Sequence, residues 1–389
     1  MQTAQRMASF PPYFFARLAE RIARLKEAGK DIIRLDVGSP DLPPAPFIIE
    51  ALKRSAAGPD NHGYQPFGGP KVFRQAVSDY YGKRFGVELD PAAEIEGLIG
   101  SKEGVFHMTQ ACLNPGDVAL VPDPGYPVYA SSAAYAGGEV VYMPLLEAND
   151  FLPALDAVPA EALRRARLMW LNYPNNPTGA VAPPEFLAEA VDFAGRHDLL
   201  LCHEAPYTEV AFDGYAPHSL LEVPGAKEVA VEFNSLSKTY NMGGWRIGAA
   251  CGNAEAIRAL HTLKSNLDSA SFLPLYHAAA VALTGDQGWL GERNEIYRER
   301  RDIVVAGLRA AGLEVRAPQA TLYVWPRVPA GMKSEEFTTA LLEEAGVSLT
   351  PGTAFGPGGE GYARISVGIA TPRLREAMEW LVEWVGSRP

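Results

Sequence analysis

Short apolar runs alternate with amphipathic stretches through the middle of the chain. The stretch from Pro184 to Arg196 is typical of the second kind, because its apolar residues recur at helical spacing after two prolines. Strands that alternate with helices form a mainly parallel sheet covered on both faces, so we predict an α/β fold. Ligands of such sheets bind in the loops that follow the strand ends. The runs that we interpret as buried strands are residues 118–121, 140–143, 168–171, 199–202, 229–233 and 247–250.

The two ends of the chain predict a second, smaller unit. A chain of 389 residues exceeds what one core usually holds. Near the N-terminus, a helical run from Ala16 to Ala28 precedes an apolar strand at residues 32–37. The later elements that we expect are helices at 289–308, 334–345 and from Thr371, which we interpret as an N-cap, and strands at 322–325 and 363–367. The predicted division is an N-terminal segment, 1–45, that joins a small C-terminal domain, 285–389, beside a large domain, 46–284.

Charge and cysteine content narrow the functional classes. The formal net charge is −11 and no basic run is present, so nucleic acid and anionic membranes are poor partners. The three cysteines, Cys112, Cys202 and Cys251, have neither metal-binding nor disulfide spacing, so we expect no metal site and a reducing compartment. No apolar stretch has the length of a signal-peptide core or a membrane span. A soluble cytoplasmic enzyme is the expectation.

One lysine stands among small hydroxyl residues in the stretch from Ser235 to Arg246. The apolar run at 229–231 leads into it like a buried strand, and a lysine in such a setting has a lowered pKa and can attack an aldehyde. This lysine is Lys238. Ser235, Ser237 and Arg246 offer the hydroxyls and the guanidinium that a phosphate monoester needs. Aldehyde and phosphate on one small molecule describe pyridoxal 5′-phosphate; the alternative is a loop with a solvated lysine.

Two other stretches predict ligand contacts. Residues 172–179 read Asn-Tyr-Pro-Asn-Asn-Pro-Thr-Gly, where prolines fix the loop and an asparagine amide can donate to a phenolate oxygen. A loop so dense in proline and asparagine is rarely needed merely as a turn. Residues 99–104 open a helix whose free backbone N–H groups could bind phosphate, although a simply capped helix is the commoner case.

These motifs, spread from about Pro12 to Arg364, resemble those of the pyridoxal-phosphate-dependent aminotransferases of class I/II, which have fold type I. The resemblance implies a large domain with a mainly parallel sheet of the seven-stranded type and a smaller α/β domain. It also implies that the tyrosine at position 64 reaches the cofactor phosphate of a neighbouring subunit, so a homodimer with shared sites is expected. The cofactor-binding residues that it implies are Tyr64, Ser101, Lys102, Tyr126, Asn176, Glu204, Tyr207, Ser235, Ser237, Lys238 and Arg246.

The resemblance assigns a second set of residues to the substrate. Arg364 would bind its α-carboxylate through two parallel hydrogen bonds. Gly38 would allow close backbone approach, which a side chain would block. The substrate-binding residues in this interpretation are Tyr13, Gly38, Asn176, Asn266 and Arg364.

Glu204 departs from the family pattern. Most members carry aspartate three residues before the tyrosine that matches Tyr207, where a carboxylate keeps the cofactor's pyridine nitrogen protonated. Glutamate preserves the charge but adds a methylene, which the loop must absorb. We expect Lys238, Glu204 and Tyr207 to be the catalytic residues, with Tyr207 donating to the phenolic oxygen of the cofactor.

The predicted activity is transamination between an amino acid and a 2-keto acid by a ping-pong cycle, with Lys238 as general base and acid. The resemblance is strongest to the LL-diaminopimelate aminotransferase branch, in the Pro-Pro-Tyr-Phe-Phe start and in residues 100–104 and 359–364. Related branches use alanine or aspartate. A carbon–sulfur β-lyase is the alternative within the fold. A non-catalytic regulator is disfavoured, because no residues remain for a DNA-binding domain.

Overall fold

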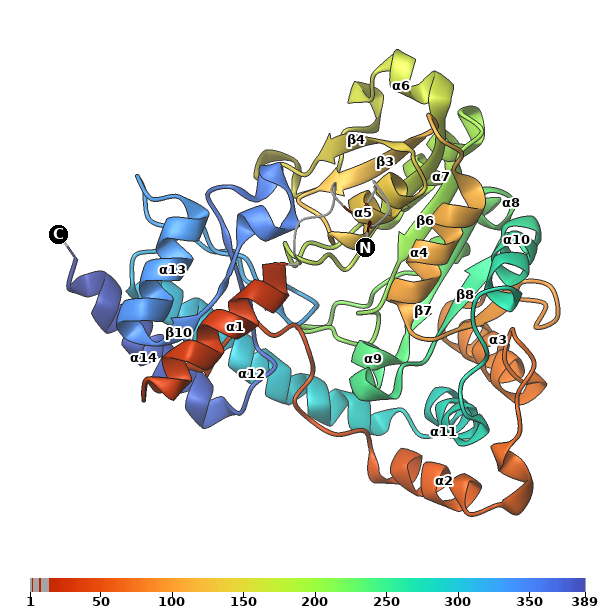
Figure 1. Cartoon of the computed structure of the whole chain (residues 1–389), viewed down its shortest axis with the longest axis horizontal. Helices are drawn as coiled ribbons and strands as arrows, with labels where there is room; N and C mark the ends of the chain where they lie inside the picture. The colour runs from red at the N-terminus through yellow and green to blue at the C-terminus, as the bar shows by residue number, and fades with distance from the viewer. Residues whose placement is uncertain (1, 3–6, 8–13, 389) are drawn as a thin grey trace.

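A seven-stranded sheet crosses the larger part of the molecule, on the right of Figure 1. The computed structural model describes residue 2, residue 7 and residues 14–388. The strands of this sheet are β2 (Ile95–Leu98), β3 (Val118–Asp123), β4 (Glu139–Pro144), β5 (Ala166–Leu171), β6 (Leu200–Glu204), β7 (Ala230–Ser235) and β8 (Gly248–Gly252). Their order is β2-β8-β7-β6-β5-β3-β4, and only β8 runs against its neighbours. The predicted, mainly parallel sheet is therefore confirmed.

Alternate residues of each strand are buried on opposite faces of this sheet, as a strand periodicity of two requires. In β5, Leu168 and Trp170 pack on one face, whereas Met169 and Leu171 pack on the other. The first face is covered by α4 (Ser101–Cys112), α5 (Val128–Tyr135) and α10 (Ala254–Ser265). The second face is covered by α3 (Lys71–Phe85), α7 (Pro184–Arg196) and α11 (Leu273–Thr284). Strands buried on both sides explain the continuous apolar runs in the sequence.

The strand ends meet at one edge of the sheet. β7 ends at Ser235, which pairs with Gly248, the first residue of β8. Gly248 also pairs with Leu98, the last residue of β2. Glu204, the last residue of β6, pairs with Phe233 near the end of β7. The loops after β2, β6 and β7 and the loop before β8 therefore open at the same edge, where ligands of parallel sheets bind.

The smaller part, on the left of Figure 1, is built from both ends of the chain. Its strands form the parallel pair β1 (Ile33–Arg34) with β10 (Val347–Ser348) and an antiparallel sheet of order β11 (Thr350–Pro351), β12 (Ala363–Ser366) and β9 (Tyr323–Val324). Its helices are α1 (Phe14–Glu27), α13 (Ser334–Ala345) and α14 (Thr371–Gly386). The predicted second α/β unit is confirmed.

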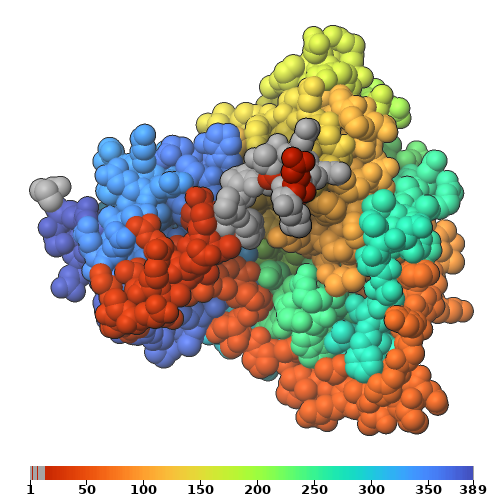
Figure 2. Space-filling model, viewed as in Figure 1, coloured from red at the N-terminus to blue at the C-terminus, as the bar shows by residue number. Residues whose placement is uncertain are grey.

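One long helix connects the two parts. α12 (Gly288–Ala310) contributes Leu290 to the core under the large sheet, and Val304 and Leu308 to the core of the smaller part. Figure 2 shows residues 14–27 on the smaller part and the chain after them continuing along the lower edge of the larger part. The domain limits at residues 45/46 and 284/285 stay a prediction.

The remaining α-helices are α2 (Pro46–Ala56), α6 (Ala160–Arg165), α8 (Ala226–Val229) and α9 (Leu236–Thr239).

Several expected element ends differ from those in the structure by one or more residues, and three of these differences are described here. Thr371 begins α14 rather than capping it, because its hydroxyl instead accepts a hydrogen bond from Arg300 Nε at 3.1 Å. Val229 ends α8, so the strand after it begins one residue later. The apolar run at 32–37 forms only a two-residue strand, because the carbonyl of Asp36 accepts hydrogen bonds from the side chains of Arg364 and Thr350. Among the described residues, no helix is long and apolar enough to span a bilayer.

Candidate active site

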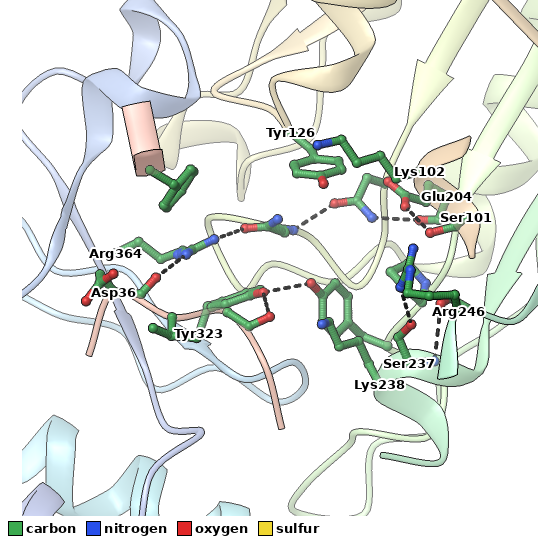
Figure 3. Close-up of a pocket in the computed structure, with 18 of the residues that line it drawn as sticks. Asp36, Ser101, Lys102, Tyr126, Glu204, Ser237, Lys238, Arg246, Tyr323 and Arg364 are labelled. Atoms are coloured by element: carbon green, nitrogen blue, oxygen red, sulfur yellow. Dashed lines mark hydrogen bonds between the residues drawn. The ribbon is translucent and has the colours of Figure 1, made fainter. Parts of the chain in front are cut away.

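A cavity of about 450 Å³ opens at this sheet edge, between the larger and smaller parts. Figure 3 shows Arg364 and Asp36 at one end and Arg246 with Ser237 at the other. Twelve of the residues predicted from the sequence line it: Gly38, Ser101, Lys102, Tyr126, Asn176, Glu204, Tyr207, Ser235, Ser237, Lys238, Arg246 and Arg364. These residues come from distant points in the sequence and converge because the strand ends converge.

Lys238 rises from α9, the short helix directly after β7. The Ser235 side chain caps this helix by accepting a hydrogen bond from the backbone N–H of Ser237 at 3.3 Å. The pKa of Lys238 is lowered to about 8, mainly by burial and also by the positive charges of Arg246 and Arg364, while the nearby Glu204 acts in the opposite direction. An amine with this pKa is partly unprotonated near neutral pH, so it can act as a nucleophile or accept a proton.

The Arg246 end of the cavity is suited to an anion. The guanidinium donates to Gly243 O at 3.1 Å, to Ile99 O at 3.1 Å and to Ser237 Oγ at 3.4 Å, which fixes it beside the start of α4. Gly100 precedes this helix at a φ of 81° and offers no side-chain cap, and Ser101 and Lys102 of its first turn line the cavity, so the N–H groups of this turn could bind an anion. A Cβ at Gly100 would lie 2.3 Å from Arg246 Nη2, so only glycine allows the guanidinium to reach this place.

Glu204 is buried at the end of β6 and lines the cavity. Ser101 Oγ donates to its Oε1 at 2.6 Å, and the Tyr129 hydroxyl donates to its Oε2. Burial raises the pKa of Glu204, while these two hydrogen bonds and the charge of Lys238 act in the opposite direction. The carboxylate is therefore oriented by two hydroxyl donors and faces the cavity, where it could pair with a cationic group of a ligand.

The loop after β5 links the two parts of the molecule. Asn172 donates through Nδ2 to Glu204 O at 2.6 Å and accepts the backbone N–H of Asn176 at 2.8 Å. The Oδ1 of Asn176 accepts from Arg364 Nη1 at 2.9 Å. With Oδ1 facing Arg364, the Nδ2 group of Asn176 remains a donor for a ligand. The buried ring of His203, on β6, accepts a hydrogen bond from the Tyr173 backbone N–H at 3.2 Å and so helps to fix this loop.

Arg364 is buried among aromatic rings. Its guanidinium lies 4.3 Å from the ring centre of Tyr323, 4.7 Å from that of Phe355 and 5.7 Å from that of Phe15. Its Nη2 donates to Asp36 O at 2.9 Å. Planar faces on several sides hold the guanidinium while its remaining N–H groups can bind a carboxylate in two parallel hydrogen bonds.

Tyr207 meets Tyr323 at the centre of the cavity. The two hydroxyls are 2.9 Å apart, and the Tyr323 hydroxyl also reaches Gly38 O at 3.4 Å. Burial and the neighbouring Tyr323 raise the pKa of Tyr207 well above its ordinary value, so it stays a protonated donor. A Cβ at Gly38 would lie 2.5 Å from the Tyr323 hydroxyl. Glycine is therefore needed here to leave room for Tyr323, in addition to any room that a ligand needs.

The remaining predicted residues are not in this cavity. Tyr64 is 94% exposed in the single chain, in the Gly/Pro-rich loop before α3. Asn266 is exposed at the C-terminal cap of α10, where its Nδ2 donates to Thr262 O at 2.8 Å, and it does not line the cavity of its own chain. Roles for both therefore stay predictions. Tyr13 lies outside the described residues.

Sequence reasoning missed several residues of the cavity. Tyr129 lies on α5, and its aromatic character alone did not distinguish it from a core residue. Tyr323 falls in an expected strand, and only its contact with Tyr207 shows its place. Arg34 and Asp36 did give a signal, since two charged residues with strand spacing interrupt an apolar run and so share one face.

The comparisons with known proteins agree over nearly the whole chain. The model of the family described as aminotransferase class I and II matches residues 30–381. A protein named LL-diaminopimelate aminotransferase from Moorella thermoacetica is 50% identical over 387 residues, which is 100% of this chain and 99% of the relative. One of the same name from Desulforudis audaxviator is 53% identical over 378 residues, 97% of this chain and 96% of the relative.

Solved structures show the same architecture. The substrate-bound BacF structure from Bacillus subtilis is 38% identical, with a TM-score of 0.95 over 99% of this chain and 98% of the other. A probable N-succinyldiaminopimelate aminotransferase from Thermus thermophilus is also 38% identical, with a TM-score of 0.89 over 95% of this chain and 99% of the other.

Proposed function

Because this chain belongs to the aminotransferase class I and II family, and is a transaminase, we propose that it uses pyridoxal 5′-phosphate to move the amino group of an LL-diaminopimelate-type substrate to a 2-keto acid. The observation that carries the proposal is the position of Lys238. Its amine has a pKa lowered to about 8 and lies between an anion-binding end at Arg246 and a carboxylate-binding end at Arg364.

The residues present fit this cofactor. Donors for the phosphate oxygens are supplied by Arg246, by Ser235 and Ser237, and by the backbone N–H groups in the uncapped first turn of α4. Glu204 offers a carboxylate for the pyridine nitrogen, held by Ser101 and Tyr129. The Tyr126 ring lines the cavity and offers an aromatic face for the pyridine. When bound, pyridoxal 5′-phosphate supplies an aldehyde that takes up the amino group and a ring that draws electrons from the substrate α-carbon.

The side chains of this protein would have the following roles in the reaction. Lys238 Nζ would hold the cofactor through its aldehyde group, and once an amino acid has displaced the lysine, the free amine would accept the proton of the substrate α-carbon and donate it to the cofactor's aldehyde carbon. The lowered pKa keeps part of this amine unprotonated near neutral pH. Glu204 keeps the pyridine nitrogen protonated through its opposite charge. Asn176 Nδ2 and Tyr207 donate to the phenolic oxygen, and Arg364 binds the α-carboxylate.

The substrate assignment is supported by the identity to the relatives named LL-diaminopimelate aminotransferase, at 50% and 53%. The same identity favours transamination over the β-lyase that the sequence left open. For the reaction to be a transamination, the Arg364 end must accept an amino acid and a 2-keto acid in turn, which share only an α-carboxylate and a short chain. Arg364 is the group in this cavity that recognises what the two substrates share.

We also propose a homodimer as the working unit. The loop that carries Tyr64 exposes this residue almost completely, beside the half-exposed apolar Phe67 and Val72. Such exposed apolar side chains favour an interface. The three cysteines form no disulfide, which supports a reducing compartment such as the cytoplasm.

Trapping the cofactor tests the central assignment. Borohydride treatment of the holoprotein should abolish its visible absorbance band and leave the cofactor attached to the peptide that contains Lys238. Lys238→Ala should lose transamination while still binding cofactor through its phosphate. Attachment to another lysine would contradict the proposal, and a panel of amino donors that includes LL-diaminopimelate, with 2-oxoglutarate or pyruvate as acceptor, tests the substrate.

A further inference from the structure

A buried arginine behind Lys238 has no part in the reaction described above. Arg293 lies on α12 and is only 3% exposed. It does not line the cavity, so it would touch neither the cofactor nor the substrate. Its guanidinium lies 5.4 Å from the ring centre of Trp289, and burial lowers the pKa of Arg293 to about 10. This charge has therefore been taken out of water at a place without direct contact to a ligand.

The partners of Arg293 differ from those of the other two buried arginines on α12. Arg300 pairs with Asp41 at 2.7 Å, and Arg301 pairs with Asp302 at 2.8 Å. Within the part of the chain that the structure describes, the hydrogen-bond acceptors of Arg293 are all neutral oxygens. Burying a cation without an acidic partner is costly, so these neutral acceptors indicate what the residue is for.

Three of these acceptors are backbone carbonyls next to the active site. Arg293 Nη1 donates to Thr239 O and, at 3.3 Å, to Lys238 O, while Nη2 donates to Glu209 O. The last carbonyls of a helix have no partner within the helix, so a single side chain satisfies the end of α9. Glu209 follows Tyr207 by two residues. Arg293 thus connects the helix that carries Lys238 to the loop that carries Tyr207.

Two asparagines fix the guanidinium itself. Asn294 Oδ1 accepts from Arg293 Nε at 3.2 Å and from Nη2 at 2.8 Å, and its own Nδ2 donates to Glu209 O at 3.0 Å. Asn241 Oδ1, in the turn after α9, accepts from Nη1 at 3.5 Å. All three guanidinium nitrogens therefore have acceptors. A planar group held in this way on a long helix is a rigid support for the carbonyls that it binds.

We propose that Arg293 is a positioning residue for Lys238. By holding the carbonyls of Lys238 and Thr239, it fixes where the lysine amine lies relative to the anion-binding end at Arg246. This inference rests on the proposed function, because it takes Lys238 as the group that binds the aldehyde of a phosphorylated cofactor. The ordinary alternative is that Arg293 only attaches α12 to the larger part of the molecule and stabilises the fold.

A matched pair of aldehydes, tested on the apoprotein, separates these interpretations. Pyridoxal 5′-phosphate and pyridoxal share the reactive ring and differ in the phosphate, which should place the aldehyde beside the amine and accelerate attachment to Lys238. At one pH both rates depend on the same fraction of unprotonated amine, so their ratio does not depend on the pKa of Lys238. Arg293→Met should lower this ratio about 10- to 100-fold, the effect of displacing a reacting group by about 1 Å.

Two further variants make the result decisive. Arg293→Met leaves several carbonyls without a donor and could reduce the folding yield. Arg293→Lys keeps the charge but replaces three nitrogens by one, so its ratio should lie between those of wild type and Arg293→Met. Arg301→Gln is the matched control, because Arg301 is also buried on α12 and does not line the cavity. Its partners Asp213 and Asp302 are 45% and 50% exposed, so its loss should leave the ratio unchanged.

The holoenzyme gives a second measurement. Arg293→Met should lower kcat for transamination more than it changes KM, because the proton transfer depends on the position of Lys238 whereas Arg364, which binds the substrate carboxylate, is not touched by Arg293. Arg301→Gln should leave both constants near their wild-type values.

Failure of the positioning role and failure of the proposed function give different results. A wild-type ratio of the two rates in the soluble Arg293 variants, with only a lower thermal stability, would overturn the positioning role. A wild type in which the phosphate gives no acceleration, or in which borohydride traps the aldehyde on a lysine other than Lys238, would overturn the proposed function itself.

Discussion

The Tyr129 hydroxyl donates a hydrogen bond to the carboxylate of Glu204. This contact helps to position the glutamate side chain, which is one methylene longer than the aspartate of most family members. Tyr129 is fully buried on α5 and stacks on Trp170, with ring centres 5.1 Å apart. Ser101 holds the other carboxylate oxygen from the start of α4. Two donors on neighbouring helices thus hold the carboxylate at the end of this longer side chain.

Tyr129→Phe should move the acidic limb of the pH–rate profile to higher pH. The phenyl ring keeps the stacking on Trp170, so the fold should be retained. Glu204 loses a donor that lowers its pKa, so its pKa rises further above the ordinary value and the carboxylate takes up a proton at a higher pH. Activity that depends on the ionised carboxylate is then lost earlier on acidification.

The measurement is kcat/KM against pH, together with a pH titration of the absorbance of the bound cofactor. Tyr142→Phe, on the half-exposed face of β4, is the control and should leave both curves in place. An unshifted acidic limb in Tyr129→Phe would mean that the hydrogen bond from Tyr129 does not influence the ionisation of Glu204.

Much of the fold and of the site could be predicted from this sequence, because both depend on local patterns. Continuous apolar runs gave the parallel strands, and helical spacing gave α7 and α13 with the bounds that the structure shows. The lysine, asparagine and arginine motifs lie on loops after strand ends, where topology alone brings them together.

Other residues could not be predicted, since their roles come from contacts between distant segments. Tyr129 and Glu204 are 75 residues apart, and Tyr207 and Tyr323 are 116 apart. No spacing rule relates such pairs. The places of Tyr64 and Asn266 depend on surfaces that a single chain leaves exposed.

Gly38 and Tyr323 should be coupled in a double-mutant cycle. Gly38→Ala alone should reduce activity at least about 10-fold, because its Cβ would lie 2.5 Å from the Tyr323 hydroxyl and push that ring toward Tyr207 and Arg364. In Tyr323→Phe the nearest remaining ring atoms lie 3.2 Å away, a tight but tolerable contact. Gly38→Ala should therefore cost much less in the Tyr323→Phe background.

The cycle is measured by kcat/KM for the four proteins. If the two single effects simply multiply, the glycine serves close approach to the substrate instead of to Tyr323. The thermal stability of each variant, compared with wild type, distinguishes a displaced ring from a damaged fold.

Lys238 should titrate far below an ordinary lysine in the apoprotein. Its rate of reaction with pyridoxal, which lacks the phosphate, should rise with an apparent pKa of about 8. Burial is the main cause and Arg246 contributes, so Arg246→Gln should raise the apparent pKa. Arg373→Gln, a surface arginine elsewhere, should leave it unchanged. An apparent pKa near ~10.4, that of a free lysine, would show that the amine is solvated.

Tyr64 should act across a subunit interface. Lys238→Ala and a Tyr64 variant are each expected to be impaired, but mixing them should produce hybrid dimers in which one site keeps both native residues. With random exchange, about half of the dimers are hybrids, and each carries one intact site, so activity should recover to roughly a quarter of the wild-type value. Absence of recovery after exchange has been verified with labelled subunits would show that each site is complete within one chain.

Glu204→Gln should affect the holoenzyme and the apoprotein in opposite ways. In the holoenzyme, a neutral amide no longer stabilises the protonated pyridine nitrogen, and a shift of two pKa units, at ~1.4 kcal/mol each, corresponds to a loss of turnover of about 100-fold. Cofactor should remain bound through its phosphate and Lys238. Glu204→Asp should keep more activity than Glu204→Gln, although the shorter chain withdraws from Ser101 and Tyr129.

In the apoprotein the same substitution should be stabilising, and increasingly so as the pH rises. Burial raises the folded-state pKa of Glu204, so the folded protein still holds a proton at pH values where the unfolded chain has released it. The free energy of unfolding of the wild type therefore falls as the pH rises from the unfolded pKa through the folded pKa, and this loss is absent in Glu204→Gln. The measurement is the free energy of unfolding in urea, for wild type and Glu204→Gln, at about pH 5 and about pH 8. The difference between the two proteins at one pH is subtracted from the difference at the other, so any pH-independent cost of rearranging the two hydroxyl donors cancels. Glu379→Gln, on α14 and away from the cavity, is the control. A difference that stays constant with pH, combined with near-normal turnover of the holoenzyme, would show that Glu204 is neither the buried charge nor the partner of the pyridine nitrogen.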